Sequence, residues 1–191
     1  MLWMNQEERL FRRLERHIVE KRLRDGFLND EATDVDGFIK FSLSIQNRRK
    51  SRAGYALENH IEEIFIQNKI LYNREARTEN KSKPDFIFPH IDNYLDFDYP
   101  AKYLNMLAAK TTCKDRWRQI LTEADRIPEK HLLTLEPGIS ENQTNEMIVQ
   151  NVKLIVPSSL KESYTERQRS WLMNLNEFIS ILSRKQTIKI P

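Results

Sequence analysis

The chain of 191 residues is poor in several residue types, and each shortage excludes a class of structure or function. Cys113 is the only cysteine, which rules out an internal disulfide and a zinc site built on cysteines. The four histidines lie too far apart in the sequence to form the close pair of a zinc-protease helix. No apolar run approaches the ~20 residues that span a bilayer, and the N-terminus lacks a signal-peptide core. A reduced, cytoplasmic location is the default expectation.

Glycine and proline are also scarce, with four and seven residues that form no linker. Without an internal repeat, this length favours one domain with a sizeable core. Charged residues make up 31% of the chain, but the net charge of +3 permits nucleic-acid binding without arguing for it. Clustered cations are more informative, because phosphate neutralisation requires them. Two clusters occur: Arg48, Arg49, Lys50 and Arg52, and Lys110, Lys114, Arg116 and Arg118.

The order of apolar patterns predicts helices first and then an alternation of strands and helices. The first helix ends near Gly26, a second begins near Asp34 or Asp36, and a third carries the stripe from Ala53 to Phe65. The second helix is expected to bury Phe38, Phe41, Leu43 and Ile45. Strands are expected at 70–72, 86–88, 103–109, 131–135 and 152–156, and helices at 114–124, 142–149 and 171–182, although the run at 101–110 is also compatible with a helix. This alternation predicts an α/β fold with a mixed central sheet flanked by helices.

The segment from Pro84 to Glu123 carries the residues for which we predict chemistry. It reads P-D-F-I-F-P, then L-A-A-K-T-T-C-K-D-R-W-R, then L-T-E. Asp85 begins an apolar strand, Lys110 closes a second one, and Glu123 lies on the flank of the predicted helix. Two carboxylates and a lysine can hold a hard divalent cation and a water beside a phosphodiester. Each residue alone has an ordinary structural explanation, and only the combination favours a catalytic site.

The triplet Lys114-Asp115-Arg116 opens the predicted helix and offers donors for guanine and an acceptor for cytosine. The alternative is an exposed, charged helix start, where an aspartate suits the helix dipole. Chemistry and sequence readout this close together suggest a site-specific DNA endonuclease.

Two further groups of charged residues can be interpreted either as functional or as ordinary surface residues. The basic cluster from Arg48 to Arg52 either contacts phosphates or forms a solvated face. Glu58 and Glu62 are most simply surface residues, but one of them would reach the metal site if their helix packs against the sheet.

Together with R-K-S-R-A-G, these segments resemble the EcoRII C-terminal catalytic domain family of type II restriction endonucleases, from about Arg48 to Leu182. The resemblance implies the three-layer PD-(D/E)XK nuclease fold and Mg²⁺-dependent cleavage of both DNA strands at CCNGG or CCWGG sites. Asp85 is similar to the family's metal-binding aspartate and Lys110 to its catalytic lysine. Glu123 resembles an acidic ligand displaced onto the helix, which accounts for Ala108 at the usual acidic position.

The resemblance also implies roles for further residues. Tyr94 and Lys114 fall where family members carry active-site residues, and Lys114-Asp115-Arg116 resembles the triplet that reads the C:G pairs. Relatives flip the central base pair and stack it against an arginine and an aromatic residue of an N-terminal helix. The candidates for this role are Arg9, Phe11, Arg12 and Arg13.

We therefore expect residues 1–191 to form one catalytic domain, with N-terminal helices at 1–47 for DNA contact or dimerisation and a nuclease core at 48–191. The expected partners are double-stranded DNA, a second copy in a homodimer that matches a near-palindromic site, and a cognate DNA methyltransferase. One dimer is expected to act on one site. Two alternatives stay open at this point: a repair or structure-specific nuclease of the same fold, and a DNA-binding module without catalysis.

Overall fold

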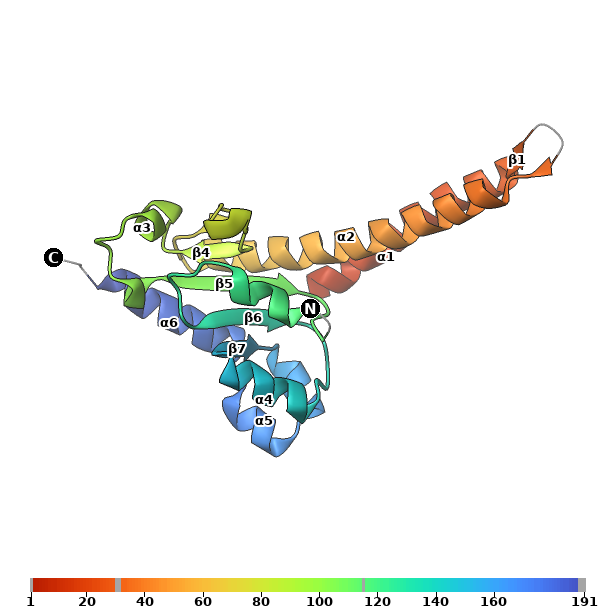
Figure 1. The fold of residues 1–191 in the computed structure, drawn as a ribbon. Helices are drawn as coiled ribbons and strands as arrows, with labels where there is room; N and C mark the ends of the chain where they lie inside the picture. The colour runs from red at the N-terminus through yellow and green to blue at the C-terminus, as the bar shows by residue number, and fades with distance from the viewer. Residues whose placement is uncertain (1, 30–31, 115, 189–191) are drawn as a thin grey trace. The chain divides into compact units, whose positions relative to one another are not determined.

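A computed structural model of the protein describes residues 2–29, 32–114 and 116–188. The chain divides into two compact units, Met1–His60 and Ile61–Pro191, and each is described by itself. Figure 1 labels the helices and strands. In the described ranges, no helix is both long enough and apolar enough to cross a membrane.

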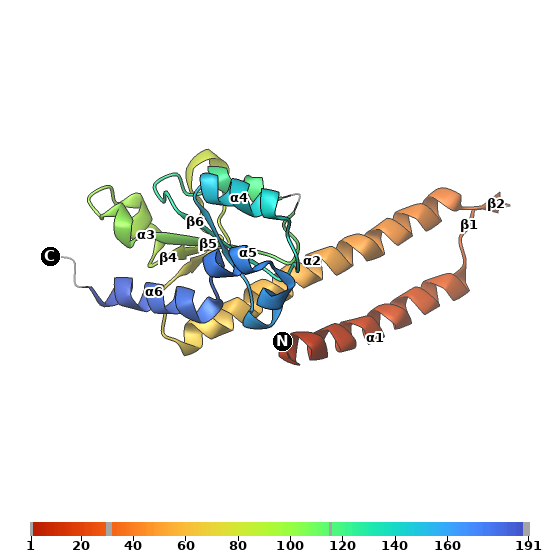
Figure 2. The same ribbon diagram turned by 90° about the horizontal axis from the view of Figure 1, so that it is seen from below.

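The first unit is a helical hairpin of α1 (Leu2–Asp25) and the first part of α2 (Val35–Gln67), joined by the short strands β1 (Leu28–Asn29) and β2 (Ala32–Thr33) (Figures 1 and 2). Gly26 has a φ of 77° and its N–H donates to the Arg22 carbonyl, so it ends α1 as predicted. The Asp34 carboxylate accepts a hydrogen bond from the Gly37 N–H at 2.8 Å and begins α2.

A single helix stands where the sequence predicted two, because nothing between Gln46 and Ala53 interrupts α2. This stretch holds no proline and no β-branched residue, and arginine and lysine are good helix formers. The predicted burial was right for Ile45 but wrong for Phe38 and Leu43, whose exposed fractions are 47% and 52%. Among the described residues of this unit, α1 and the Phe27 ring pack on α2, with Phe27 5.4 Å from Phe38 and 5.6 Å from Phe41, and the rest of the α2 surface stays exposed.

Ion pairs between the helices set the register of the hairpin. The Arg49 guanidinium donates to both carboxylate oxygens of Glu15, from Nε at 2.8 Å and from Nη2 at 2.6 Å. Arg52 pairs with Glu8, and His60 Nε2 lies 3.2 Å from Glu7. Glu15 is only 3% exposed, and the hydrogen bond from Arg49 lowers the pKa of its carboxyl.

The second unit contains a five-stranded sheet in the order β3 (Asn73–Arg74), β4 (Phe86–Phe88), β5 (Asn105–Lys110), β6 (Lys130–Thr134) and β7 (Val152–Ile155). β3, β4 and β5 pair antiparallel, whereas β5, β6 and β7 pair parallel. The predicted mixed sheet is therefore confirmed. The strand expected at 70–72 was wrong, because the Gln186 side chain takes the backbone groups of Leu71 and pairing begins only at Asn73.

Helices and turns cover both faces of the sheet, as the three-layer prediction required (Figure 2). On one face, the short 3-10 helix η3 (Trp117–Thr122) and α4 (Glu141–Val149) pack on alternate strand residues such as Ala108 and Leu132. On the other face, the Phe65 ring lies 5.3 Å from Phe86 and 5.1 Å from Phe88. Phe178 of α6 (Leu175–Thr187) contacts Phe88 from the same side at 5.7 Å.

The helix predicted at 114–124 was wrong in type and length. Lys114 lies in a turn, Trp117–Thr122 are the helical part of this stretch among its described residues and form a 3-10 helix, and Glu123 follows its end. Trp117 and Ile120 of this 3-10 helix are buried. Ala124 closes this segment with a φ of +50°, a left-handed conformation that is uncommon outside glycine.

The predicted final helix is divided in two. α5 (Glu166–Trp171) is followed by α6, and a capping box at Asn174 begins the second helix. The remaining elements are short: α3 (Ile91–Leu95) and the 3-10 helices η1 (Glu79–Lys81), η2 (Ala101–Tyr103) and η4 (Ser158–Ser163).

Candidate active site

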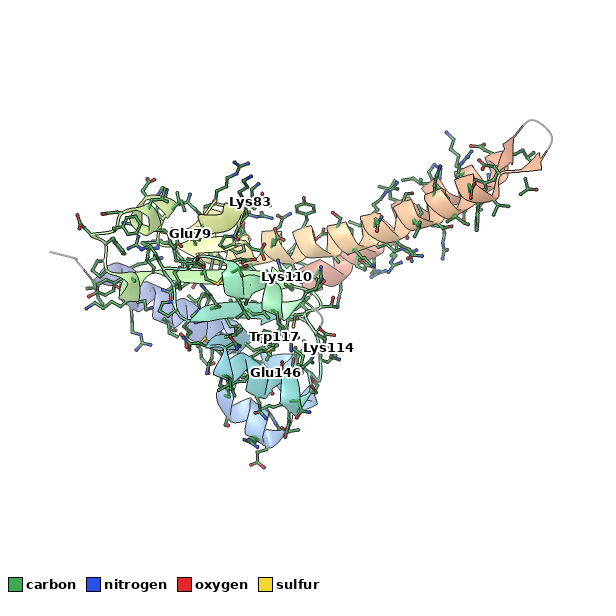
Figure 3. All side chains as sticks on the ribbon, in the orientation of Figure 1. Glu79, Lys83, Lys110, Lys114, Trp117 and Glu146 are labelled. Carbon is green, nitrogen blue, oxygen red and sulfur yellow. The ribbon has the colours of Figure 1, made fainter. Side chains whose placement is uncertain are left out.

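Asp85 and Lys110 meet at one edge of the sheet. Phe86 pairs with Leu107, so the antiparallel register sets Asp85 opposite Ala108, and strand alternation gives Asp85 and Lys110 the same face. Asp85 Oδ2 accepts hydrogen bonds from the Ala109 N–H at 2.7 Å and from Lys110 Nζ at 2.9 Å. Both side chains keep some exposure, 13% and 23%, so a ligand can reach the pair from solvent. Figure 3 labels Lys110 at the end of β5.

Glu123 belongs to the same site through its electrostatics. Burial raises the pKa of its carboxyl to about 7, Lys110 opposes this rise, and the Asp85 charge adds to it. Among the described residues, Glu123 Oε2 is buried without a hydrogen-bond partner. A buried acceptor without a donor is costly in a native fold. This carboxylate therefore has the properties expected of a ligand for an ion that the chain itself does not supply.

Lys130 holds the backbone that carries Glu123. Its Nζ donates to the carbonyls of Glu123 at 2.5 Å and Ala124 at 2.7 Å. The side chain is 5% exposed, and burial lowers its pKa. Sequence reasoning missed this residue because a lysine at the start of a strand has no pattern that distinguishes it from a surface residue.

Tyr94 lies beside the site without contacting Asp85. It is buried on α3, and its hydroxyl donates to Glu79 Oε2 at 2.5 Å. Burial and this hydrogen bond raise the pKa of Tyr94. Glu79 Oε2 also accepts from the Asp125 N–H at 3.4 Å, so Tyr94 and Glu79 support the chain just after Glu123.

The segment 111–116 lies between β5 and η3 and is called here the readout loop, because the sequence predicts that it reads bases. Lys114 is half-buried, and its Nζ lies 3.6 Å from Glu136 Oε1. Arg116 is exposed, and its Nη2 donates to the Thr112 carbonyl at 3.1 Å. Asp115 lies outside the described residues. Figure 3 shows Lys114 labelled near the end of the sheet.

In the first unit, the predicted phosphate-binding cluster has two kinds of members. Arg49 and Arg52 are engaged in the ion pairs of the hairpin, whereas Arg48 and Lys50 are exposed on α2. Glu58 is half-buried on the same helix. An exposed cation can bind a phosphate without breaking an ion pair. A cation that is paired with a carboxylate must first lose that pair, which costs free energy.

The four candidates for base flipping lie on α1 and differ in environment. Arg9 and Arg13 are exposed, and Arg12 Nε donates to Glu8 at 2.6 Å. Phe11 is half-buried under the Arg52 guanidinium, which lies 4.7 Å from the ring centroid. Phe11 and Arg52 also line a pocket of about 570 Å³ between α1 and α2. The remaining lining residues are Glu7, Asn47, Arg48, Ser51, Tyr55, Ala56 and Asn59.

Glu62, in the second unit, is engaged elsewhere. Its carboxylate accepts from the Tyr72 hydroxyl at 2.9 Å and from Arg74 Nη1 at 2.7 Å. Burial and this contact with Glu62 raise the pKa of Tyr72 to about 12. Glu62 thus has a structural role next to β3.

The carboxylates at the sheet edge suit a hard cation whose other ligands come from a substrate. Within the described residues, no group of three or more histidine, cysteine, aspartate or glutamate side chains is arranged to hold a metal ion. Asp85 and Glu123 offer two carboxylates, and Mg²⁺ is usually bound by one or two carboxylates together with phosphate oxygens and water. The unpartnered Oε2 of Glu123 fits this arrangement.

Solved structures share this fold. A complex of the restriction endonuclease PspGI with substrate DNA matches 96% of the chain and 77% of its own length, with a TM-score of 0.74 at 16% identity. Metal-depleted Ecl18kI in complex with uncleaved, modified DNA matches 98% of the chain and 68% of its own length, with a TM-score of 0.73 at 17% identity. The chain thus has a fold similar to that of restriction endonucleases.

The sequence comparison gives the family. The profile described as "EcoRII C terminal" matches residues 11–179. The type II restriction enzyme EcoRII of Escherichia coli is 48% identical over 170 residues, which is 88% of this chain and 41% of that enzyme. The chain belongs to the EcoRII C-terminal family and spans less than half the length of this relative.

Proposed function

We propose that the chain is the catalytic domain of a type II restriction endonuclease that hydrolyses both strands of double-stranded DNA at a CCNGG- or CCWGG-like site. The observations that support this proposal are the contact between Asp85 and Lys110 at one sheet edge, the electrostatic interaction of Glu123 with both, and the Glu123 carboxylate oxygen that is buried without a partner among the described residues. Membership of the EcoRII C-terminal family supports it.

Asp85 and Glu123 would hold Mg²⁺, which when bound offsets charge on the phosphate and acidifies a bound water. Glu123 must first lose its proton, and burial makes this unfavourable below about pH 7. Lys110 Nζ donates to Asp85 and has further donors with which to orient a phosphate oxygen or the attacking water. Tyr94 supports the Glu123 segment from outside through Glu79.

Recognition of bases falls to the readout loop. Lys114 and Arg116 would donate to guanine N7 and O6, and Asp115 would accept from cytosine N4. Arg48 and Lys50 are the members of the basic cluster exposed enough to contact phosphates directly. Arg49 and Arg52 would contribute there only after leaving Glu15 and Glu8.

The pocket lined by Phe11 and Arg52 is the proposed receptor for a flipped central base. The Phe11 ring and the Arg52 guanidinium on its surface are groups on which a base can stack. Replacing Phe11 with alanine should reduce the fluorescence increase of 2-aminopurine placed at the central position of the site. An unchanged increase would show that the base is not held there.

The proposed partners are double-stranded DNA, a second copy of the chain and a cognate DNA methyltransferase. Two strands of a near-palindromic site are cut most simply by two active sites related by a twofold axis. We expect one dimer to act on one site, so plasmids with one and two sites should be cut at equal rates per site. A strong preference for the two-site plasmid would favour a tetramer or a transient synapse instead.

Digestion of plasmid DNA with Mg²⁺ tests the activity. Discrete fragments that end at CCNGG or CCWGG sites are expected, whereas smeared products would indicate a structure-specific nuclease and intact DNA a binding module. Asp85→Ala should give intact DNA. Asp92→Ala is the matched control, because Asp92 is 83% exposed on α3 and should leave the fragment pattern unchanged.

A further inference from the structure

The readout loop needs an external support, because it is not the start of an α-helix. Of the predicted helix at 114–124, only Trp117–Thr122 is helical, and Lys114 lies in the turn before it. Backbone N–H groups in such a turn have no partners within a helix and need acceptors from elsewhere. A loop that reads bases must also hold its donors in one place, since direct readout depends on geometry.

Glu136 lies where it can supply that support. β5 and β6 run parallel with Lys110 paired to Thr134, so the two strands end at the same edge of the sheet. Glu136 follows Thr134 by two residues, and the readout loop follows Lys110 directly. The catalytic lysine, the loop and Glu136 are therefore neighbours at one edge.

The Glu136 carboxylate binds the backbone of the readout loop. Its Oε2 accepts hydrogen bonds from the Cys113 N–H at 2.6 Å and the Lys114 N–H at 3.0 Å. Its Oε1 lies 3.6 Å from Lys114 Nζ. From α4, Gln143 Nε2 donates to the Lys114 carbonyl at 3.0 Å. The peptide groups on both sides of Lys114 are thus held by side chains of other elements.

Glu136 is itself firmly held. The Tyr164 hydroxyl donates to the Glu136 carbonyl at 2.6 Å, and the Glu136 N–H donates to Thr134 Oγ1 at 3.1 Å. The side chain is only 14% exposed. Burial raises the pKa of its carboxyl, but the N–H groups of Cys113 and Lys114 outweigh this and lower it overall. Charge-assisted hydrogen bonds of this kind are about twice as strong as neutral ones.

We propose that Glu136 is a positioning residue for specificity, which fixes the readout loop so that Lys114 and Arg116 meet their bases. The inference rests on the proposed function, because it concerns the same loop. Glu136 holds the backbone of Cys113 and Lys114 and pairs with the Lys114 ammonium, so it acts through this loop. Its loss should therefore affect the choice of sequence more than the chemistry at Asp85.

The test compares wild type, Glu136→Ala and Glu136→Gln on cognate duplexes and on duplexes with one substituted base. We expect Glu136→Ala to lower the ratio of kcat/KM for cognate over substituted DNA by roughly 10-fold, within the range of one lost base contact. The Mg²⁺ dependence of cleavage should stay unchanged. Glu136→Gln should retain an intermediate ratio, because its amide oxygen can still accept from both N–H groups.

Two further variants complete the experiment. Glu146→Ala is the matched control, since it removes an exposed carboxylate that pairs with Arg118 and should leave the ratio unchanged (Figure 3). Gln143→Ala releases the other side of Lys114 and should lower the ratio in the same direction. It keeps the inference testable if Glu136→Ala does not fold.

The outcomes separate the inference from the function on which it rests. If Arg116→Ala lowers the ratio while Glu136→Ala and Gln143→Ala leave it at the wild-type value, the positioning role is refuted and the proposed function stands. If Arg116→Ala also has no effect, the loop does not read bases. If the wild type cuts no DNA, the proposed function fails and the inference fails with it.

Discussion

Replacing Glu123 with glutamine should stabilise the metal-free protein above neutral pH while removing its affinity for a cation. Burial raises the pKa of this carboxyl from 4.5 to about 7. Below about pH 4.5 the group is protonated in both the folded and the unfolded chain. As the pH rises, the unfolded chain ionises first, so the folded state loses stability until the pH has passed about 7. Glutamine cannot ionise and should escape this loss.

The size of the effect follows from the pKa. The difference between 4.5 and about 7 corresponds to roughly 3 kcal/mol at ~1.4 kcal/mol per unit of pKa. Glu123 keeps contact with solvent, which weakens the effect, so we expect about 1–2 kcal/mol in the free energy of unfolding. Unpaired amide hydrogens of glutamine shift the absolute stability equally at all pH values. The change in relative stability between acid and alkaline pH therefore measures the effect of the Glu123 charge alone.

Urea unfolding of both proteins in EDTA, at pH 4 and pH 8.5, measures this difference. The stability of Glu123→Gln relative to wild type should rise by about 1–2 kcal/mol between the two pH values. Adding Mg²⁺ at pH 8.5 should stabilise the wild type, because a ligand of the folded state alone does so, and should leave Glu123→Gln unchanged. If the stability of Glu123→Gln relative to wild type is the same at both pH values, burial does not raise the pKa of the Glu123 carboxyl as proposed.

Three further predictions concern other contacts. Asp85→Ala and Lys110→Ala should each lower kcat by at least ~100-fold, with specific binding in Ca²⁺ kept near the wild-type value in a gel-shift assay. Arg116→Ala should cost ~1–3 kcal/mol of discrimination, read from competition between cognate and substituted duplexes. Arg49→Met should destabilise the protein at pH 7, because it removes the guanidinium that donates to the Glu15 carboxylate. Since that contact lowers the pKa of Glu15, the loss in urea unfolding should shrink as the pH falls below about 4.

The sheet was the part of the fold best predicted from the sequence. Apolar runs such as Phe86–Phe88 and Val152–Ile155 have the composition and length of buried strands, and tertiary contacts did not change them. The helices were predicted less well. Nothing local distinguishes one long helix from two in the stretch around Arg49, and the turn at Lys114 depends on Glu136, which lies 22 residues further along the chain.

The sequence could predict those residues of the candidate site whose side chains would take part in the chemistry directly. Asp85, Lys110 and Glu123 could be selected from their order and spacing; in the structure Lys110 donates to Asp85, and Glu123 interacts electrostatically with both. The residues that hold them in place could not be selected. Lys130 and Glu136 act through backbone carbonyl and N–H groups, and a sequence does not reveal which side chain will meet which peptide group.

The direct covalent connection between β5 and the readout loop has a consequence for where DNA is cut. Lys110 and Lys114 are four positions apart, and four residues span at most about 14 Å. A DNA strand rises ~3.4 Å per nucleotide, so this stretch of chain covers at most about four nucleotides. Under the proposed function it is a molecular ruler that ties the scissile bond to the base being read. Inserting a residue into this ruler would shift the cleavage position relative to the recognised base, whatever the arrangement of subunits.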